Sequence, residues 1–240
     1  MIRALLFDLD GTLLDNDMET FLPPYFEALT KRLAQLIPPD QLITQILAST
    51  SVMMANTDPT KTNQQVFLED FFPKIGYPAE ELMPLFDEFY ANDYPKLQRH
   101  VRKRPEARSL METIFRAGYS VVIATDPVFP LTAVQQRLQW AGVSDFPYAL
   151  VTSYENMHFC KPHGQYYQEV AQRIGRETGQ CLMVGNDLKR DIVPAARVGM
   201  RTFLVAERPP ESLDATTNVD LCGSLTDLSR LIKQGALRDI

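Results

Sequence analysis

The sequence predicts an α/β protein: a three-layer core with a parallel β-sheet, plus one inserted all-helical segment. Short apolar runs alternate with amphipathic stretches over most of the chain, and this alternation breaks once, between residues 15 and 100. Alternating apolar strands and amphipathic helices are typical of parallel sheets that are covered on both faces. At 240 residues the chain has room for one large domain or for one domain with an insertion.

The expected core elements follow from these apolar and amphipathic runs. In a parallel sheet, ligands bind at the carboxyl ends of the strands, so polar residues that follow the strands should meet at one edge. We expect strands at residues 3–8, 119–124, 148–152, 181–185 and 201–205, and helices at about 106–117, 130–141, 163–175 and 189–198.

The segment 15–100 contains no convincing strand and carries helical periodicity instead. Leu22, Phe26, Leu29 and Leu33 keep the spacing of one helix face. Four helices of this kind would bury their apolar faces against one another as a bundle. They are expected at residues 19–37, 40–54, 63–73 and 78–92.

The most informative string follows the first strand and reads Asp8-Leu9-Asp10-Gly11-Thr12. Side chains two residues apart on a strand point the same way, and Gly11 lets the backbone turn sharply. Two carboxylates placed side by side are costly unless a cation or a proton lies between them. The pair therefore predicts a Mg²⁺ site in which one carboxylate can also attack phosphorus.

Three further motifs follow apolar runs later in the chain. Thr125 ends the strand 119–124, and Lys161 stands before a proline. After the strand 181–185 comes the string Gly185-Asn186-Asp187-Leu188-Lys189-Arg190-Asp191, which combines a glycine with two spaced acids. The threonine and the lysine are weak signals alone, since a threonine often caps a helix and a lysine often lies on the surface. The string with two spaced acids is a stronger signal, because it is rarer. The order of the motifs along the chain carries the argument.

Together the four motifs resemble the haloacid dehalogenase (HAD) superfamily of aspartyl-phosphate-forming hydrolases. The resemblance covers the core and is weakest over residues 15–100. It implies a Rossmann-like core formed by residues 1–14 and 101–240, with residues 15–100 as a helical cap domain of a phosphatase-like member.

The resemblance also implies the roles of the catalytic residues. Asp8 would be the nucleophile, and Asp10 would be the general acid and base. Thr125 and Lys161 would bind the phosphoryl group. Dehalogenases of the superfamily lack the second acid, because a halide leaves without a proton, so Asp10 favours a phosphatase.

Magnesium is the implied cofactor. Its ligands would be Asp8, the backbone carbonyl of Asp10 and Asp187, with Asp191 as outer support for the metal and for the lysine. The fourth motif departs slightly from the commonest family string, which leaves Asn186 as an alternative ligand.

Asp126 is a second departure, since many relatives carry asparagine at this position. An extra negative charge beside a phosphate site is unfavourable unless it is turned away or bonded to a backbone N–H. We assign Asp126 to substrate binding, where it could also meet a cationic substrate group.

Composition excludes several classes of function. The formal net charge is −6 with no basic block, which disfavours nucleic-acid binding, and no apolar run approaches the ~20 residues of a membrane span. Three cysteines at unrelated spacings fit a reducing cytoplasm. We expect a cytoplasmic monomer or homodimer acting on a small phosphorylated metabolite. The alternatives are a phosphomutase and a HAD-like binding or regulatory protein with little turnover.

Overall fold

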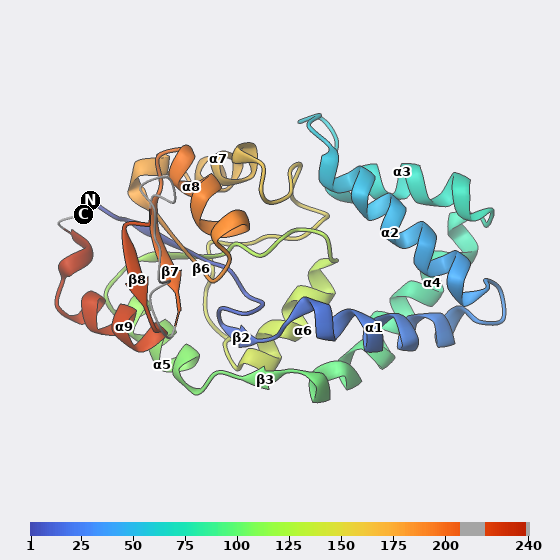
Figure 1. Cartoon of the computed structure of the whole chain (residues 1–240), viewed down its shortest axis with the longest axis horizontal. Coiled ribbons are helices and arrows are strands. Elements are labelled where there is room, and N and C mark those ends of the chain that lie inside the picture. The colour runs from blue at the N-terminus through green and yellow to red at the C-terminus, as the bar shows by residue number, and fades with distance from the viewer. Residues whose placement is uncertain (207–218, 239–240) are drawn as a thin grey trace.

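The computed structural model describes residues 1–206 and 219–238, and in this part of the chain six parallel strands form one sheet. Figure 1 shows the sheet with helices around it, which confirms the predicted α/β fold. Strand β1 lies in the middle, as its fully buried sequence requires. The strands, in their order across the sheet, are β5 (Leu150–Val151), β4 (Ser120–Ile123), β1 (Ala4–Phe7), β6 (Cys181–Gly185), β7 (Arg201–Val205) and β8 (Leu221–Gly223).

The alternation of side chains along β1 explains why both faces of the sheet are covered. Leu5 and Phe7 belong to one apolar cluster with residues of three helices, α5 (Pro105–Arg116), α6 (Leu131–Ala141) and α9 (Leu225–Lys233). Ala4 and Leu6 belong to a second cluster with residues of α7 (Gly164–Arg173) and α8 (Val193–Arg197). The result is a three-layer core, because successive side chains of a strand face opposite sides.

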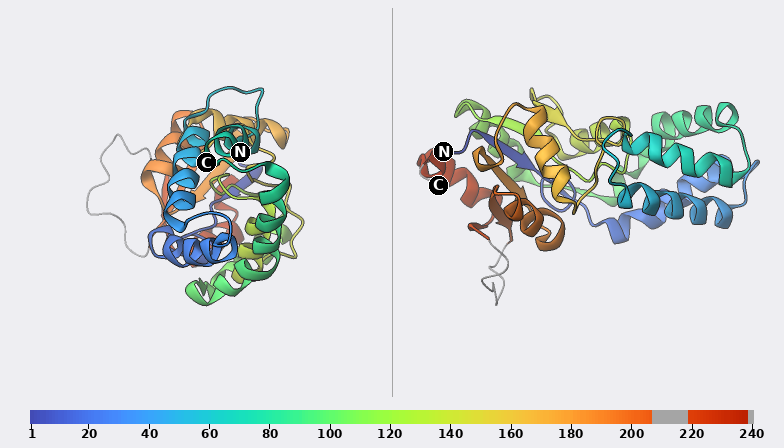
Figure 2. Two further views of the ribbon diagram at one scale, coloured as in Figure 1. Left: turned by 90° about the vertical axis from the view of Figure 1, so that its right-hand side faces the viewer. Right: turned by 90° about the horizontal axis from the view of Figure 1, so that it is seen from above.

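The helical unit, which we define as helices α1–α4, lies at one end of the elongated molecule. Figures 1 and 2 show it beyond the edge of the sheet at which β1 ends. Within the described residues, no helix has the length and apolar character needed to span a membrane. The helices of the helical unit are α1 (Met18–Leu33), α2 (Pro39–Ala55), α3 (Asn63–Ile75) and α4 (Ala79–Glu88). They are followed by the π-helical turn η1 (Phe89–Asp93) and the 3₁₀ segment η2 (Tyr94–His100).

Capping explains where several of these helices begin and end. The side chain of Asp17 accepts a hydrogen bond from the N–H of Glu19 at the start of α1. Thr62 and Gln65 form a reciprocal capping box at the start of α3, and Gly76 ends that helix in a left-handed conformation.

The structure differs from the sequence prediction at the connections. Two short strands, β2 (Leu14–Asp15) and β3 (Arg102–Lys103), pair antiparallel where the chain leaves and re-enters the core. They were too short for periodicity to reveal. Strand β8 and helix α9 were also missed, and the expected helix 189–198 begins as a π-helical turn, η4 (Leu188–Ile192). The remaining short turns are η3 (Thr178–Gln180) and η5 (Ala236–Arg238).

Candidate active site

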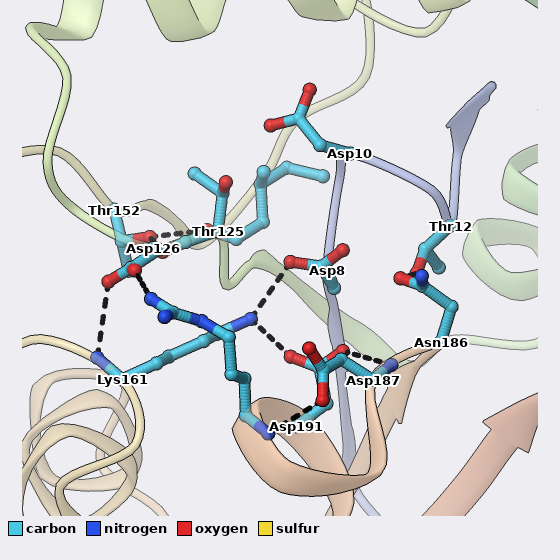
Figure 3. A network of polar contacts seen from close by, with 12 residues as sticks. Asp8, Asp10, Thr12, Thr125, Asp126, Thr152, Lys161, Asn186, Asp187 and Asp191 are labelled. Carbon is cyan, nitrogen blue, oxygen red and sulfur yellow. Dashed lines mark hydrogen bonds and ion pairs between the residues drawn. The ribbon is translucent and has the colours of Figure 1, made fainter. Parts of the chain in front are cut away.

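Strand register brings the predicted site residues to one edge of the sheet. Phe7 is level with Ile123 of β4 and with Val184 of β6, so the residues after all three strands emerge together. The backbone N–H of Asp8 extends this pairing by donating to the carbonyl of Val184 at 2.9 Å. Asp8, Thr125 and Asp187 therefore come together although more than a hundred residues separate the first two (Figure 3).

Lys161 joins two buried carboxylates. Its Nζ donates to Oδ1 of Asp8 at 2.9 Å and to Oδ1 of Asp191 at 2.6 Å. Burial alone would lower the pKa of Lys161, but the two carboxylates outweigh burial and raise it well above its ordinary value. The lysine, which is only 1% exposed, is therefore a buried ammonium group.

The two carboxylates share this single ammonium, which cannot fully compensate both charges. Burial raises the pKa of Asp8 above its ordinary value, although Lys161 opposes the shift. Burial likewise raises the pKa of Asp191 to about 6. The cluster carries more negative than positive charge, so a further cation at this place would be stabilised.

The loop after β6 holds Asp191 against the lysine. Oδ2 of Asp191 accepts a hydrogen bond from the backbone N–H of Asp187 at 3.0 Å. A Cβ on Gly185 would lie 2.2 Å from the same oxygen, so only glycine fits at this position. Oδ1 of Asp187 accepts from the N–H groups of Lys189 and Arg190, at 2.8 and 3.1 Å, and so caps the following turn.

The turn after Asp10 packs tightly against this loop. Gly11 has a φ of +84°, and a Cβ there would lie 2.6 Å from Nδ2 of Asn186. The hydroxyl of Thr12 donates to Oδ1 of Asn186 at 3.0 Å. The first and fourth motifs therefore lie side by side, which explains the glycine in the first motif.

Asp10 points away from the group around Lys161, as Figure 3 shows. Its Oδ1 accepts from Nδ2 of Asn16 at 2.7 Å, and its Oδ2 pairs with Nη1 of Arg137. Each acid of the first motif therefore has a cationic side chain of its own, Lys161 for Asp8 and Arg137 for Asp10.

Sequence reasoning missed Arg137. This residue lies on α6, is 1% exposed, and holds its guanidinium 4.7 Å from the ring centroid of Phe129. A signal was present, because Val134 and Ala141 lie three residues before and four residues after it, on the same helix face. An arginine on an apolar helix face is rarely buried unless it has a partner.

Asp126 is bonded within the protein. Its Oδ1 accepts from the backbone N–H of Lys161 at 3.2 Å, and its Oδ2 forms an ion pair with Arg190. This is the arrangement that makes a negative charge tolerable at this position, since backbone and guanidinium donors compensate it. Thr125, beside it, is buried, and its backbone carbonyl accepts hydrogen bonds from the hydroxyls of Thr152 and Tyr166.

A cavity of about 1100 Å³ opens above these residues. Asp8, Thr125 and Lys161 line one end of it, with Asn186 and Asp187. Side chains from all four helices of the helical unit line much of the rest, together with core residues such as Phe129, Thr132 and Glu155. The cavity therefore places the polar cluster at the base of a chamber that the inserted helices complete.

The oxygen atoms at this base suit a hard cation. Within residues 1–206 and 219–238, no three His, Cys, Asp or Glu side chains are grouped as a metal site. The available donors are instead two carboxylates, from Asp8 and Asp187, with the amide oxygen of Asn186 and the backbone carbonyl of Asp10. Mg²⁺ prefers oxygen ligands and keeps several waters, so this small set fits it.

Fold and site together define a class: a Rossmann-like hydrolase core with a helical insertion after its first strand. More specifically, the chain belongs to the haloacid dehalogenase-like hydrolase family, whose model matches residues 2–199. It is a hydrolase, as the family and the phosphatase names among its relatives indicate.

Curated relatives agree with this assignment, and a solved structure shares the fold. The pyrophosphatase PpaX of Oceanobacillus iheyensis is 25% identical over 205 residues, which cover 85% of this chain and 84% of that protein. The phosphoglycolate phosphatase of Salmonella typhi is 26% identical over 210 residues, covering 82% and 79%. A 2-haloacid dehalogenase from Pseudomonas syringae pv. Tomato DC3000 shares the fold, with a TM-score of 0.65, 20% identity and coverage of 98% and 100%.

Proposed function

We propose that the protein is a Mg²⁺-dependent phosphatase that hydrolyses a phosphomonoester through an aspartyl phosphate on Asp8. One observation carries the proposal: Lys161 holds Asp8 at the carboxyl edge of the sheet, with Asp191 on the other side of its Nζ. The phosphatase names of the two relatives support the same reaction class.

Electrostatics explains why the nucleophile needs these neighbours. A carboxylate about 4 Å from one phosphate charge is repelled by roughly 4 kcal/mol at an effective dielectric near 20. The ammonium of Lys161 offsets part of this repulsion while it positions the attacking oxygen of Asp8. A magnesium ion held by Asp8, the Asp10 carbonyl and Asp187 or Asn186 would neutralise more of the phosphoryl charge.

The reaction then proceeds in two balanced steps. An oxygen of Asp8 attacks phosphorus while the ester oxygen leaves and takes the proton from Asp10, which must enter this step as the neutral acid and leaves it as a carboxylate. Water, deprotonated by Asp10, next attacks phosphorus, releases phosphate and restores the Asp8 carboxylate. Thr125 would donate its hydroxyl to a phosphoryl oxygen.

Asp10 also separates this proposal from dehalogenation. A halide leaves without a proton, whereas an alkoxide leaving group needs one. The structure keeps the Asp10 carboxylate beside the cavity and bonds it to two partners, Asn16 and Arg137. The likeness to a dehalogenase structure concerns the fold, at 20% identity.

We further propose that residues 15–100 act as a cap domain on a core formed by residues 1–14 and 101–240. The proposal rests on the short antiparallel pair β2 and β3, which lies where these two parts join. It also rests on the cavity, which side chains of both parts line. Closure of such a cap would exclude water and strengthen the charge interactions around the phosphoryl group.

The test is phosphate release from p-nitrophenyl phosphate by the purified protein, with and without Mg²⁺. We expect Mg²⁺-dependent release and a phosphoenzyme that carries its phosphate on Asp8, located by mass spectrometry after rapid acid quench. Chloride release from 2-chloropropionate without any phosphatase activity would contradict the proposal.

A further inference from the structure

The chamber beneath the helical unit is far larger than a phosphoryl group requires. Small-molecule sites typically enclose roughly 300–1,000 Å³, and this cavity measures about 1100 Å³. Lys161 and the acids around it occupy only its base. The remaining space must hold the leaving group of the ester, because the phosphoryl group stays at Asp8.

The walls of this space are mainly apolar. They include an aliphatic or aromatic side chain from every helix of the helical unit. Representative residues are Leu22 and Phe26 of α1, Ile46 of α2, Phe67 and Phe71 of α3 and Phe86 of α4.

Charge in the chamber is as informative as its apolar character. The structure describes segment 18–91 throughout, and no Lys, Arg or His of that segment lines the cavity. The charged residues that it contributes to the lining are acids, Glu19 and Asp87. A carboxylate or second phosphate on the leaving group would find no cation on this segment and would be repelled by these acids. The arginines that line the cavity belong to the core and already have partners: Arg104 donates to the carbonyl of Gly11, Arg137 pairs with Asp10 and Arg190 pairs with Asp126.

The aromatic residues hold one another in place. The rings of Phe67 and Phe71 stack with centroids 5.3 Å apart, and Phe71 meets Phe86 edge-on at 6.0 Å. The hydroxyls of Tyr25 and Tyr90 bond to each other at 3.0 Å. These two hydroxyls are therefore already paired with each other, and the apolar wall is formed before any ligand binds.

From these observations we infer that the substrate is a phosphate monoester of an uncharged, largely apolar alcohol, alkyl or aryl, with about six or more carbons. The inference rests on the proposed phosphatase activity and adds the substrate class. It narrows the expectation of a small phosphorylated metabolite, because the apolar walls would leave the hydroxyls of a polar leaving group without partners.

A homologous series of primary alkyl phosphates tests the inference on the unaltered protein. Ethyl, butyl, hexyl and octyl phosphates have similar leaving groups, so differences in kcat/KM report binding of the chain. Each buried methylene contributes about 0.8 kcal/mol, which corresponds to about a fourfold rise in kcat/KM per methylene. We expect such a rise over at least part of the series.

Two further substrates isolate charge and polarity. A 6-carboxyhexyl phosphate, matched in length, should be hydrolysed at least tenfold less efficiently than octyl phosphate, and glycerol 3-phosphate should rank with the short esters. If kcat/KM does not rise along the alkyl series, or if either polar ester is preferred, the inference is wrong. If p-nitrophenyl phosphate is still hydrolysed in that case, the proposed phosphatase activity stands and only the substrate class is wrong. If no ester releases phosphate, both the phosphatase activity and the substrate class are wrong.

Variants locate the effect in the chamber. Phe67→Asn should remove most of the rise in kcat/KM along the alkyl series, while Phe67→Leu should retain most of it. Val66→Asn changes the preceding residue of α3, which does not line the cavity, and should keep the full rise. An unchanged series in folded Phe67→Asn, checked by circular dichroism, would show that the alkyl chain binds elsewhere and would overturn the assignment to this chamber.

Discussion

Arg137 and Asp10 form an ion pair between α6 and the turn after β1, in which Nη1 of the arginine donates to Oδ2 of the aspartate. The arginine is almost completely buried, and its Nε and Nη2 have no hydrogen-bond partner. Asp10 is thus its sole hydrogen-bond acceptor within the described residues. This pair fixes the direction of the proposed acid and base, because the carboxylate cannot rotate without leaving a buried guanidinium alone.

The first prediction follows from this pair. Arg137→Gln should lower kcat for alkyl phosphates and destabilise the fold, because breaking a buried ion pair costs about 3–5 kcal/mol. Asp10→Asn should likewise lower kcat and destabilise the fold. If the arginine acts through Asp10, the double variant should lose no more activity than Asp10→Asn alone. Steady-state kinetics and urea unfolding measure both effects, and additive losses of kcat would show that Arg137 acts independently.

The second prediction concerns the nucleophile. Asp8→Asn keeps the shape of the side chain and removes the attacking charge, so turnover should fall by several orders of magnitude. The fold should survive, because Lys161 keeps Asp191 as its partner at 2.6 Å. Phosphate release and far-ultraviolet circular dichroism check the two statements. Near-normal turnover by this variant would rule out a covalent intermediate on Asp8.

The third prediction asks which side chain binds Mg²⁺. If Asp187 is the ligand, Asp187→Ala should remove most of the Mg²⁺-induced rise in thermal stability, while Asn186→Ala should retain it. A ligand at 100 times its Kd stabilises a protein by about 2.7 kcal/mol, which a melting curve resolves.

Each variant must be compared with itself with and without the ion. Asp187 also caps the following turn, and loss of a cap costs about 1 kcal/mol by itself. The reverse order of effects would assign the ligand to Asn186.

The sequence revealed the parts of this protein that depend on short-range patterns. Apolar runs located β1, β4 and β6, and parallel topology then placed Asp8, Thr125 and Asp187 at one edge without any structure. The partners of Asp10 and Asp126 were not predictable in the same way. Arg137 and Arg190 reach these acids through tertiary packing, over 127 and 64 residues of sequence, and no local period encodes such a distance.

The fourth prediction concerns the cysteines. Burial raises the pKa of Cys160 to about 12 and that of Cys181 to about 11, so neither forms appreciable thiolate at pH 8. Iodoacetamide should therefore modify the partly exposed Cys222 first in the native protein. Peptide mass spectrometry identifies the site, with urea-unfolded protein as the control in which all three react. Rapid labelling of Cys160 in the native protein would show that the loop around this buried thiol opens readily.

The last prediction concerns how the helical unit is held over the site. Asn63, the first residue of α3, is fully buried, and its Nδ2 donates to the carbonyls of Pro127 and Phe159 at 3.3 Å each. Its backbone N–H donates to the carbonyl of Met157 at 2.8 Å, and the next N–H donates to Tyr154. The start of α3 is therefore bonded to the two core loops that carry Asp126 and Lys161.

Any opening of the helical unit must break these bonds, so Asn63 should control its rate. Asn63→Ala removes both side-chain bonds and leaves two buried carbonyls with fewer donors, at a cost of about 1–3 kcal/mol. The amides of residues 63 and 64 should then exchange hydrogen at least fivefold faster. Asn56→Ala is the matched control, because Asn56 bonds to the carbonyl of His158 on the same loop but is partly exposed. Its effect should be smaller, since water can replace a bond that is not buried. Equal exchange in both variants and the unaltered protein would mean that the helical unit opens without breaking these contacts, or does not open.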